Sequence, residues 1–136
     1  MGSEMCIRDR STEEQAADNL KTFGDFKPLM EKEHETIDKV VQTLRSRVQN
    51  GCTGCAYCMP CPAGVNIPRN FKLWNQYHVY QKYEAVKFGW EGLAQKERAE
   101  SCIKCGKCET VCPQHLSIRE NLERVQKDLE EARAKQ

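Results

Sequence analysis

Long hydrophobic runs are missing from this chain of 136 residues. No stretch approaches the roughly 20 apolar residues that a membrane-spanning helix needs, and the N-terminus lacks the apolar core of a secretion signal. Lysine and arginine together number 21, aspartate and glutamate 20, so the net charge is +1. Such a balance gives no overall field for nucleic acid or an anionic membrane. We therefore expect a cytoplasmic, soluble protein that has neither nucleic acid nor a membrane as a partner.

Alternating strand patterns are also missing, and helical spacing takes their place. Apolar residues repeat every three or four positions over 30–48, which predicts an amphipathic helix with one buried stripe. We expect further helices from residue 11 to about 20, from near Pro68, from about 90 to 102, and from a capping box at Ser117 and Glu120 to about Ala134. Four aromatic residues at spacings of three should pack in the core: Trp74, Tyr77, Tyr80 and Tyr83. The predicted fold class is all-α.

Histidine is scarce, and it suggests no metal site by itself. His34 and His78 have no second ligand at metal-binding spacing, so we assign them no site. His115 either tunes a metal site at the nearby Cys112 or is a solvated residue at a helix start.

Cysteine, in contrast, is abundant, and eight of the nine cysteines fall into two runs. Each run ends in a Cys-Pro step, and the members are Cys52, Cys55, Cys58 and Cys61, then Cys102, Cys105, Cys108 and Cys112. Three thiolates at spacings of three wrap one iron-sulfur cube, and a fourth before proline reaches a second cube. In a reducing cytosol, such cysteines are better explained as metal ligands than as disulfides. The spacing predicts two [4Fe-4S] clusters and an electron-transfer function.

The fourth ligand of each cube comes from the other run in two-cluster ferredoxins. By that rule, Cys112 completes the first cluster with Cys52, Cys55 and Cys58, and Cys61 completes the second with Cys102, Cys105 and Cys108. Only Met59 and Pro60 separate Cys58 from Cys61, one residue fewer than in the second run. Ligation of each cube within its own run therefore stays open. So does a zinc-binding structural domain with four-cysteine sites.

Both runs resemble a known family. The segment from Cys52 to Pro62 with Gly64 to Pro68, and the segment from Cys102 to His115, look like the C-terminal ferredoxin-type extension of bacterial and archaeal aldo/keto reductases. The resemblance covers Gly51 to about Leu129. It implies a helical two-cluster domain rather than the short β-hairpin ferredoxin fold.

A second, shorter resemblance lies upstream. Residues 11–20 look like the start of the last barrel helix of an aldo/keto reductase, which implies contacts of Ser11, Gln15, Asp18 and Asn19 with the adenosine end of NADPH in the parent enzyme. The chain itself lacks the catalytic barrel, so we expect no carbonyl reduction and assign no catalytic residue. NAD(P)H or flavin would act only in the full-length parent.

The expected organisation has three parts. Residues 1–10 resemble a translated sequencing-adaptor remnant and are excluded from fold reasoning, which leaves Cys6 without a role. Residues 11–50 are a helical remnant and linker of the barrel, and residues 51–136 are the cluster-binding domain. The expected partners are the upstream barrel and an unidentified electron donor or acceptor. Lys72, Lys104 and Lys107 could form a docking patch for an acidic carrier or be ordinary solvated surface.

Overall fold

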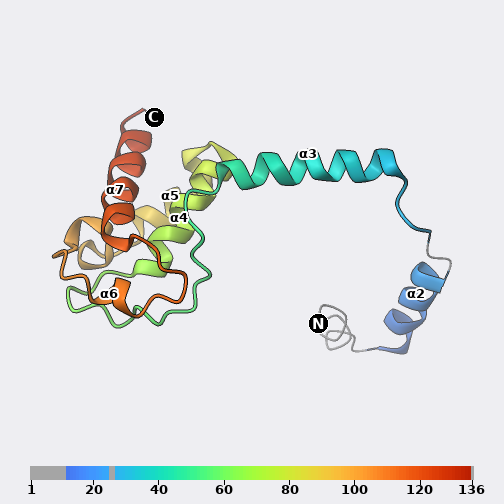
Figure 1. Cartoon of the computed structure of the whole chain (residues 1–136), viewed down its shortest axis with the longest axis horizontal. Coiled ribbons are helices and arrows are strands. Elements are labelled where there is room, and N and C mark those ends of the chain that lie inside the picture. The colour runs from blue at the N-terminus through green and yellow to red at the C-terminus, as the bar shows by residue number, and fades with distance from the viewer. Residues whose placement is uncertain (1–11, 25–26, 136) are drawn as a thin grey trace. The chain divides into compact units, whose positions relative to one another are not determined.

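The computed structural model describes residues 12–24 and 27–135, and over these residues the protein is all-α, with no β-strand. The chain divides into two units, Met1–Asp38 and Lys39–Gln136. Figure 1 labels the α-helices, which are α2 (Glu13–Gly24), α3 (Glu31–Arg47), α4 (Ile67–Tyr80), α5 (Lys87–Glu91), α6 (Lys107–Thr110) and α7 (Ile118–Ala134). Three short 3-10 helices complete the set: η1 (Tyr83–Ala85), η2 (Gln95–Glu97) and η3 (Ala99–Ser101).

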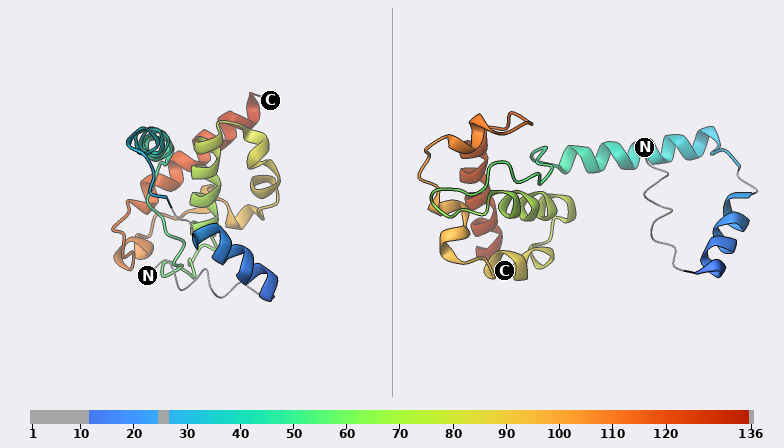
Figure 2. Two further views of the ribbon diagram at one scale, coloured as in Figure 1. Left: turned by 90° about the vertical axis from the view of Figure 1, so that its right-hand side faces the viewer. Right: turned by 90° about the horizontal axis from the view of Figure 1, so that it is seen from below.

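The core of the second unit is the packed pair α4 and α7. The predicted apolar stripe of α7 is confirmed, because Ile118, Leu122, Val125 and Leu129 are all buried. Helix α4 buries a matching face that includes Phe71 and Trp74. Both helices begin just after a Cys-Pro step, so the two cysteine segments gather where α4 and α7 start, as Figures 1 and 2 show.

The predicted aromatic face is only partly a core. Trp74 and Tyr83 are buried and Tyr77 packs against the core, but Tyr80 is 61% exposed. Helix α4 ends at Tyr80 and Gln81 takes a left-handed conformation, so the helical spacing that placed all four rings on one face does not continue.

The prediction of one helix from about 90 to 102 was wrong. This stretch holds the end of α5 followed by η2 and η3, with extended backbone at Ala94 and Arg98. The carbonyl of Glu97 accepts hydrogen bonds from the backbone of Asn66 (3.0 Å) and from the side chain of Asn70 (2.8 Å). Asn70, which is fully buried, also accepts from the backbone of Ala99 at 3.1 Å. These hydrogen bonds take the place of the backbone hydrogen bonds that one continuous helix over this stretch would have made.

The predicted capping box at the start of α7 was also wrong in its chemistry. Ser117 is the N-cap residue, but its side chain makes no capping hydrogen bond. Instead Glu109, in α6, accepts from the backbone N–H of Arg119 at 2.9 Å. The first N–H groups of a helix have no hydrogen-bond partner within the helix. The Glu109 carboxylate, from another element, therefore supplies the capping hydrogen bond that was expected from the Ser117 side chain.

Helix α3 forms where predicted but does not bury a stripe. None of its residues is buried, and Ile37, Val40 and Leu44 are 45, 53 and 45% exposed. Nothing among the described residues covers this face, whose apolar spacing is nevertheless that of a packed helix. Arg47 at its end donates to the carbonyl of Val79 at 3.0 Å and so joins α3 to the end of α4. No helix in the described ranges has the length and apolar character needed to cross a membrane.

Candidate metal centre

Eight cysteines of the two runs line two neighbouring cavities. One cavity is bordered by Cys52, Cys55, Cys58 and Cys112. The other is bordered by Cys61, Cys102, Cys105 and Cys108, and Cys58 lines both cavities. Counted with their openings to solvent, the spaces measure about 330 and about 370 Å³. Each cavity therefore collects three cysteines of one run and the Cys-Pro cysteine of the other.

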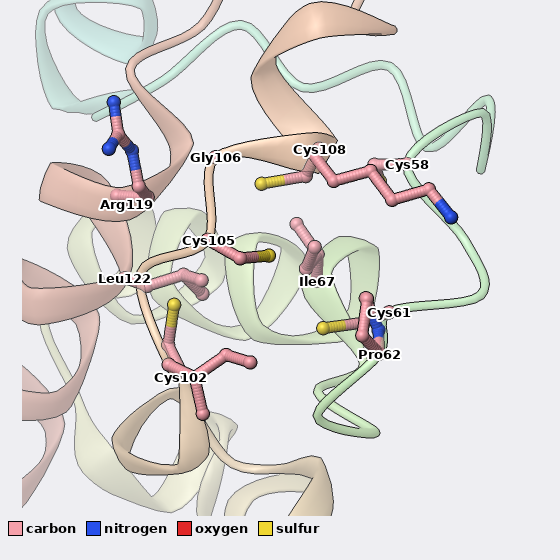
Figure 3. Close-up of a pocket in the computed structure, with 12 residues that line it drawn as sticks. Cys58, Cys61, Pro62, Ile67, Cys102, Cys105, Gly106, Cys108, Arg119 and Leu122 are labelled. Atoms are coloured by element: carbon pink, nitrogen blue, oxygen red, sulfur yellow. The ribbon is translucent and has the colours of Figure 1, made fainter.

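Figure 3 shows the cavity of the second run. The sulfur atoms of Cys61, Cys102, Cys105 and Cys108 turn toward the space between the two cysteine segments, with Ile67 behind them. The short Met59-Pro60 step therefore does not keep Cys61 away from the second run. This is the arrangement that crossed ligation requires, and the assignment of each cysteine to a cube stays a prediction.

The apolar walls of the cavities come from the core helices. Ile67, in the first turn of α4, borders both spaces, and Phe71 and Ile118 add to the wall of the first. No charged residue lines the first cavity, whereas Lys107 and Arg119 line the second. A dry, apolar wall on the core side limits the access of water to a bound cluster.

Burial changes the acidity of one thiol in each cavity. Loss of hydration raises the pKa of the Cys108 thiol to about 11, and the nearby Glu109 carboxylate acts in the same direction. Burial likewise raises the pKa of Cys58, with smaller contributions from Cys52, Cys55 and Cys112. Since metal ligands must be thiolates, cluster binding has to release these protons.

The residues present fit iron-sulfur clusters. Eight soft sulfur donors surround two spaces, and thiolates are the ligands that hold such clusters. Among the described residues, no group of three or more His, Cys, Asp or Glu side chains converges on a single metal ion.

The two cysteine segments share one backbone conformation, which the sequence analysis missed. Positive φ angles recur at equivalent loop positions, at Gly54 (73°) and Lys104 (57°), and again at Ala56 (63°) and Gly106 (79°). Gly54 and Gly106 thus supply left-handed backbone, which glycine adopts without strain.

The same repeat continues through each Cys-Pro step into the helix. The backbone N–H of Gly64 donates to the carbonyl of Cys61 at 2.9 Å, and that of His115 donates to Cys112 at 3.1 Å. Gly64 (φ 81°) and His115 (φ 50°) are both left-handed. Aligning the chain at its two Cys-Pro steps, each followed by an isoleucine five residues later, would have revealed this repeat.

An asparagine pair holds the chain as it enters the first segment. The side-chain oxygen of Asn75, in α4, accepts from the backbone of Gln49 (2.9 Å) and Asn50 (3.2 Å), and its nitrogen donates to the Asn50 carbonyl at 2.9 Å. The Asn50 side chain in turn accepts from the backbone N–H of Cys52 at 3.1 Å. The position of Cys52 is therefore set from α4.

The residues proposed to meet NADPH lie on α2, in the other unit. Gln15 and Asp18 are exposed, and the Asn19 side chain donates to the carbonyl of Gln15 at 2.7 Å. Ser11 lies outside the described residues, as does Cys6. Three of the four residues thus share one helix, and their contact with a nucleotide stays a prediction.

The remaining histidines differ in their surroundings. His115 is exposed and does not line either cavity. His78, which was given no site, lies 2.9 Å from the Asp128 carboxylate, and the indole N–H of Trp74 donates to the same oxygen at 2.8 Å. This cluster joins α4 to α7 and is structural.

Comparison with known proteins identifies the domain. Residues 51–117 match the family model described as a 4Fe-4S dicluster domain. The match spans both cysteine segments and supports iron-sulfur cluster binding there, so the four-cysteine zinc domain left open above is not favoured. No curated protein and no solved structure matches the chain.

Proposed function

We propose that this chain is the electron-transfer module of a larger oxidoreductase of the aldo/keto reductase type, and that it binds two [4Fe-4S] clusters. The observation that carries the proposal is the arrangement of eight cysteines around two cavities, each lined by three cysteines of one run and the Cys-Pro cysteine of the other, with Cys58 lining both. Such clusters supply reversible one-electron chemistry when bound. The residues of this chain hold the clusters, keep water from their core side, and fix the loops that carry the ligands.

Crossed ligation is part of the proposal. The first cluster takes Cys112 as its fourth ligand and the second takes Cys61, because each of these cysteines borders the cavity of the other run. Each cube then links the start of α4 to the start of α7. This link accounts for two features: the two helices begin in the same way, and they lie beside each other. Ligation within a run would leave the halves joined only by side-chain packing and by hydrogen bonds such as that from Trp74 to Asp128.

The parent enzyme is supported by two features. The cysteine segments resemble the C-terminal extension of aldo/keto reductases, and the segment before them carries apolar side chains that are exposed, among them Leu20, Phe23 and Met30 at 75, 62 and 68%. An upstream barrel would cover such residues. In that parent, Gln15, Asp18 and Asn19, with Ser11, would meet the adenosine end of NADPH, and electrons would pass between the barrel's cofactor and the clusters.

Metal and sulfide analysis of anaerobically purified protein tests the cluster assignment. We expect about eight iron and about eight acid-labile sulfide per chain, and a broad visible absorbance that bleaches with dithionite. A colourless protein that contains zinc and no sulfide would sink the proposal in favour of a structural zinc domain.

Substitution of Cys112 by alanine tests the crossed ligation. The expected result is damage to the cluster held by Cys52, Cys55 and Cys58, while the second cluster keeps its spectrum. Cys61→Ala is the matched variant and should damage the other cluster. If each substitution instead damages the cube of its own run, crossed ligation is wrong.

A further inference from the structure

Two open clefts flank the cluster cavities, one for each half of the repeat. The first, of about 930 Å³ with its open side counted, is lined among others by Cys52, Gly54, Pro68, Arg69, Lys72 and Asn75. The second, of about 830 Å³, is lined among others by Cys102, Lys104, Arg119, Glu123, Gln126 and Lys127. Each cleft contains the first cysteine of its run. Each therefore gives a path from the surface to one cluster.

The repeat makes the two clefts equivalent position by position. Counted from the Cys-Pro steps, Lys72 and Glu123 occupy the same place on α4 and α7, and so do Asn75 and Gln126. Gly54 and Lys104 correspond in the cysteine loops. The clefts therefore differ in charge although their frameworks are alike.

In the second cleft two of the three cations are paired. Lys104 forms an ion pair with Glu123, and the Arg119 guanidinium lies 2.8 Å from the Glu109 carboxylate. A docking partner would have to compete with these acidic partners for the cations. Outside these pairs the second cleft keeps one cation, Lys127, and one acid, Glu100, whose charges offset each other.

In the first cleft the same pairs cannot form. The counterparts of Lys104 and Arg119 are Gly54 and Pro68, which carry no charge, and Lys72 stands where the second cleft has an acid. No acidic residue lines this cleft, and over the described ranges neither Arg69 nor Lys72 forms an ion pair. Two exposed, uncompensated cations thus stand beside Cys52.

We propose that the first cleft is the docking surface for an acidic one-electron carrier protein, which exchanges electrons with the cluster held beside Cys52. The inference rests on the proposed function and adds the site at which electrons enter or leave the domain. One electron moves between carrier and cluster, so that one partner is oxidised as the other is reduced, and no bond or proton is exchanged. Both cations are exposed on an open cleft, which suits the broad face of a protein better than a small anion.

Two positive charges on the docking surface act on the rate at which an acidic carrier associates with it. Oppositely charged faces steer encounter and raise association rates by roughly 10- to 1,000-fold, an effect that salt screens. Reduction of the wild-type protein by an acidic carrier should therefore slow as ionic strength rises. Reduction by a small cation should not slow.

The test is stopped-flow reduction of the cluster-loaded protein by two donors of opposite charge, acidic flavodoxin in its hydroquinone state and reduced methyl viologen. Substituting Arg69 and Lys72 together by glutamine should lower the second-order rate with flavodoxin about tenfold at low salt. It should leave the rate with the cationic viologen unchanged or raise it. Lys127→Gln removes one cation from the second cleft, and Lys72→Gln removes one cation from the first. Only the latter should slow flavodoxin.

The outcomes separate this inference from the proposed function. Every variant is first checked for its iron and sulfide content and for bleaching by dithionite. If the wild type holds two clusters but Lys127→Gln lowers the rate of reduction by flavodoxin as much as Lys72→Gln does, the docking surface is not at the first cleft. If the double variant keeps the wild-type rate, or if salt has no effect on the wild type, the docking surface is refuted while the electron-transfer module stands. Absence of the clusters from the wild type would refute both.

Discussion

Replacing Asp128 by alanine should destabilise the domain by removing one acceptor between its two main helices. The Asp128 carboxylate accepts from the indole N–H of Trp74, whose side chain is fully buried, and it lies beside His78. An orphaned buried donor costs about 1 to 3 kcal/mol, and a bond to a charged group stands toward the upper end. We therefore expect a loss of about 2 to 3 kcal/mol in the free energy of unfolding. For a domain of this size the loss lowers the melting temperature by roughly 10 to 20 °C.

Asp128→Asn is the control, because its amide oxygen can still accept from Trp74. This variant should lose about 1 kcal/mol. Apparent melting temperatures are compared at one scan rate under anaerobic conditions, since loss of a metal cluster makes unfolding irreversible.

A double-mutant cycle with Trp74→Phe isolates the hydrogen bond. Without the indole N–H, the cost of Asp128→Ala should shrink by about 1 to 2 kcal/mol, the coupling expected for residues in direct contact. The reasoning is refuted if the alanine and asparagine variants melt together. It is equally refuted if Asp128→Ala costs as much in the Trp74→Phe background as in the wild type.

Two other substitutions probe the framework of the cluster sites. Gly64→Ala should lower the free energy of unfolding by about 1 kcal/mol in the same melting assay, because a side chain in left-handed backbone is strained. His115→Gly, at the equivalent position, should be neutral or stabilising. Equal destabilisation by both substitutions would contradict the repeat. Asn75→Ala should speed the loss of iron from the first cluster to a chelator, because it removes the hydrogen bonds that hold the chain before the first cysteine segment. Gln76→Ala, at the next position of α4, is the control. Equal rates of iron loss for the two variants would contradict the anchoring role of Asn75.

The parts of the fold that could be predicted are those in which local pattern and tertiary packing agree. The stripe of α7 follows directly from apolar spacing, and the start of α4 at Ile67 follows from the place of Pro68 in a first turn. The division of cysteines between the two cavities matches the crossed set because Cys-Pro steps send the chain toward the other run. Spacing alone could not place Cys61, whose loop is one residue shorter. In the structure Cys61 lines the cavity of the second run, and its assignment to a cube stays a prediction.

Other parts depend on contacts that no local pattern records. The stretch from about 90 to 102 holds a single glycine, Gly92, where α5 ends. Beyond it, Asn70 and Asn66 donate to the Glu97 carbonyl, and the backbone forms short turns in place of a helix. Glu109 caps α7 from another element. Helix α3 has the spacing of a buried helix, but periodicity reports only that a face is apolar and not what covers it.

Electron paramagnetic resonance of the fully reduced protein tests the central claim most directly. Two [4Fe-4S] clusters held side by side predict one unpaired spin for each cluster and a spectrum broadened by interaction between the two. The titration that leads to this state should consume about two electrons per chain. One electron per chain with an unbroadened signal, or no signal at all, would contradict a two-cluster domain.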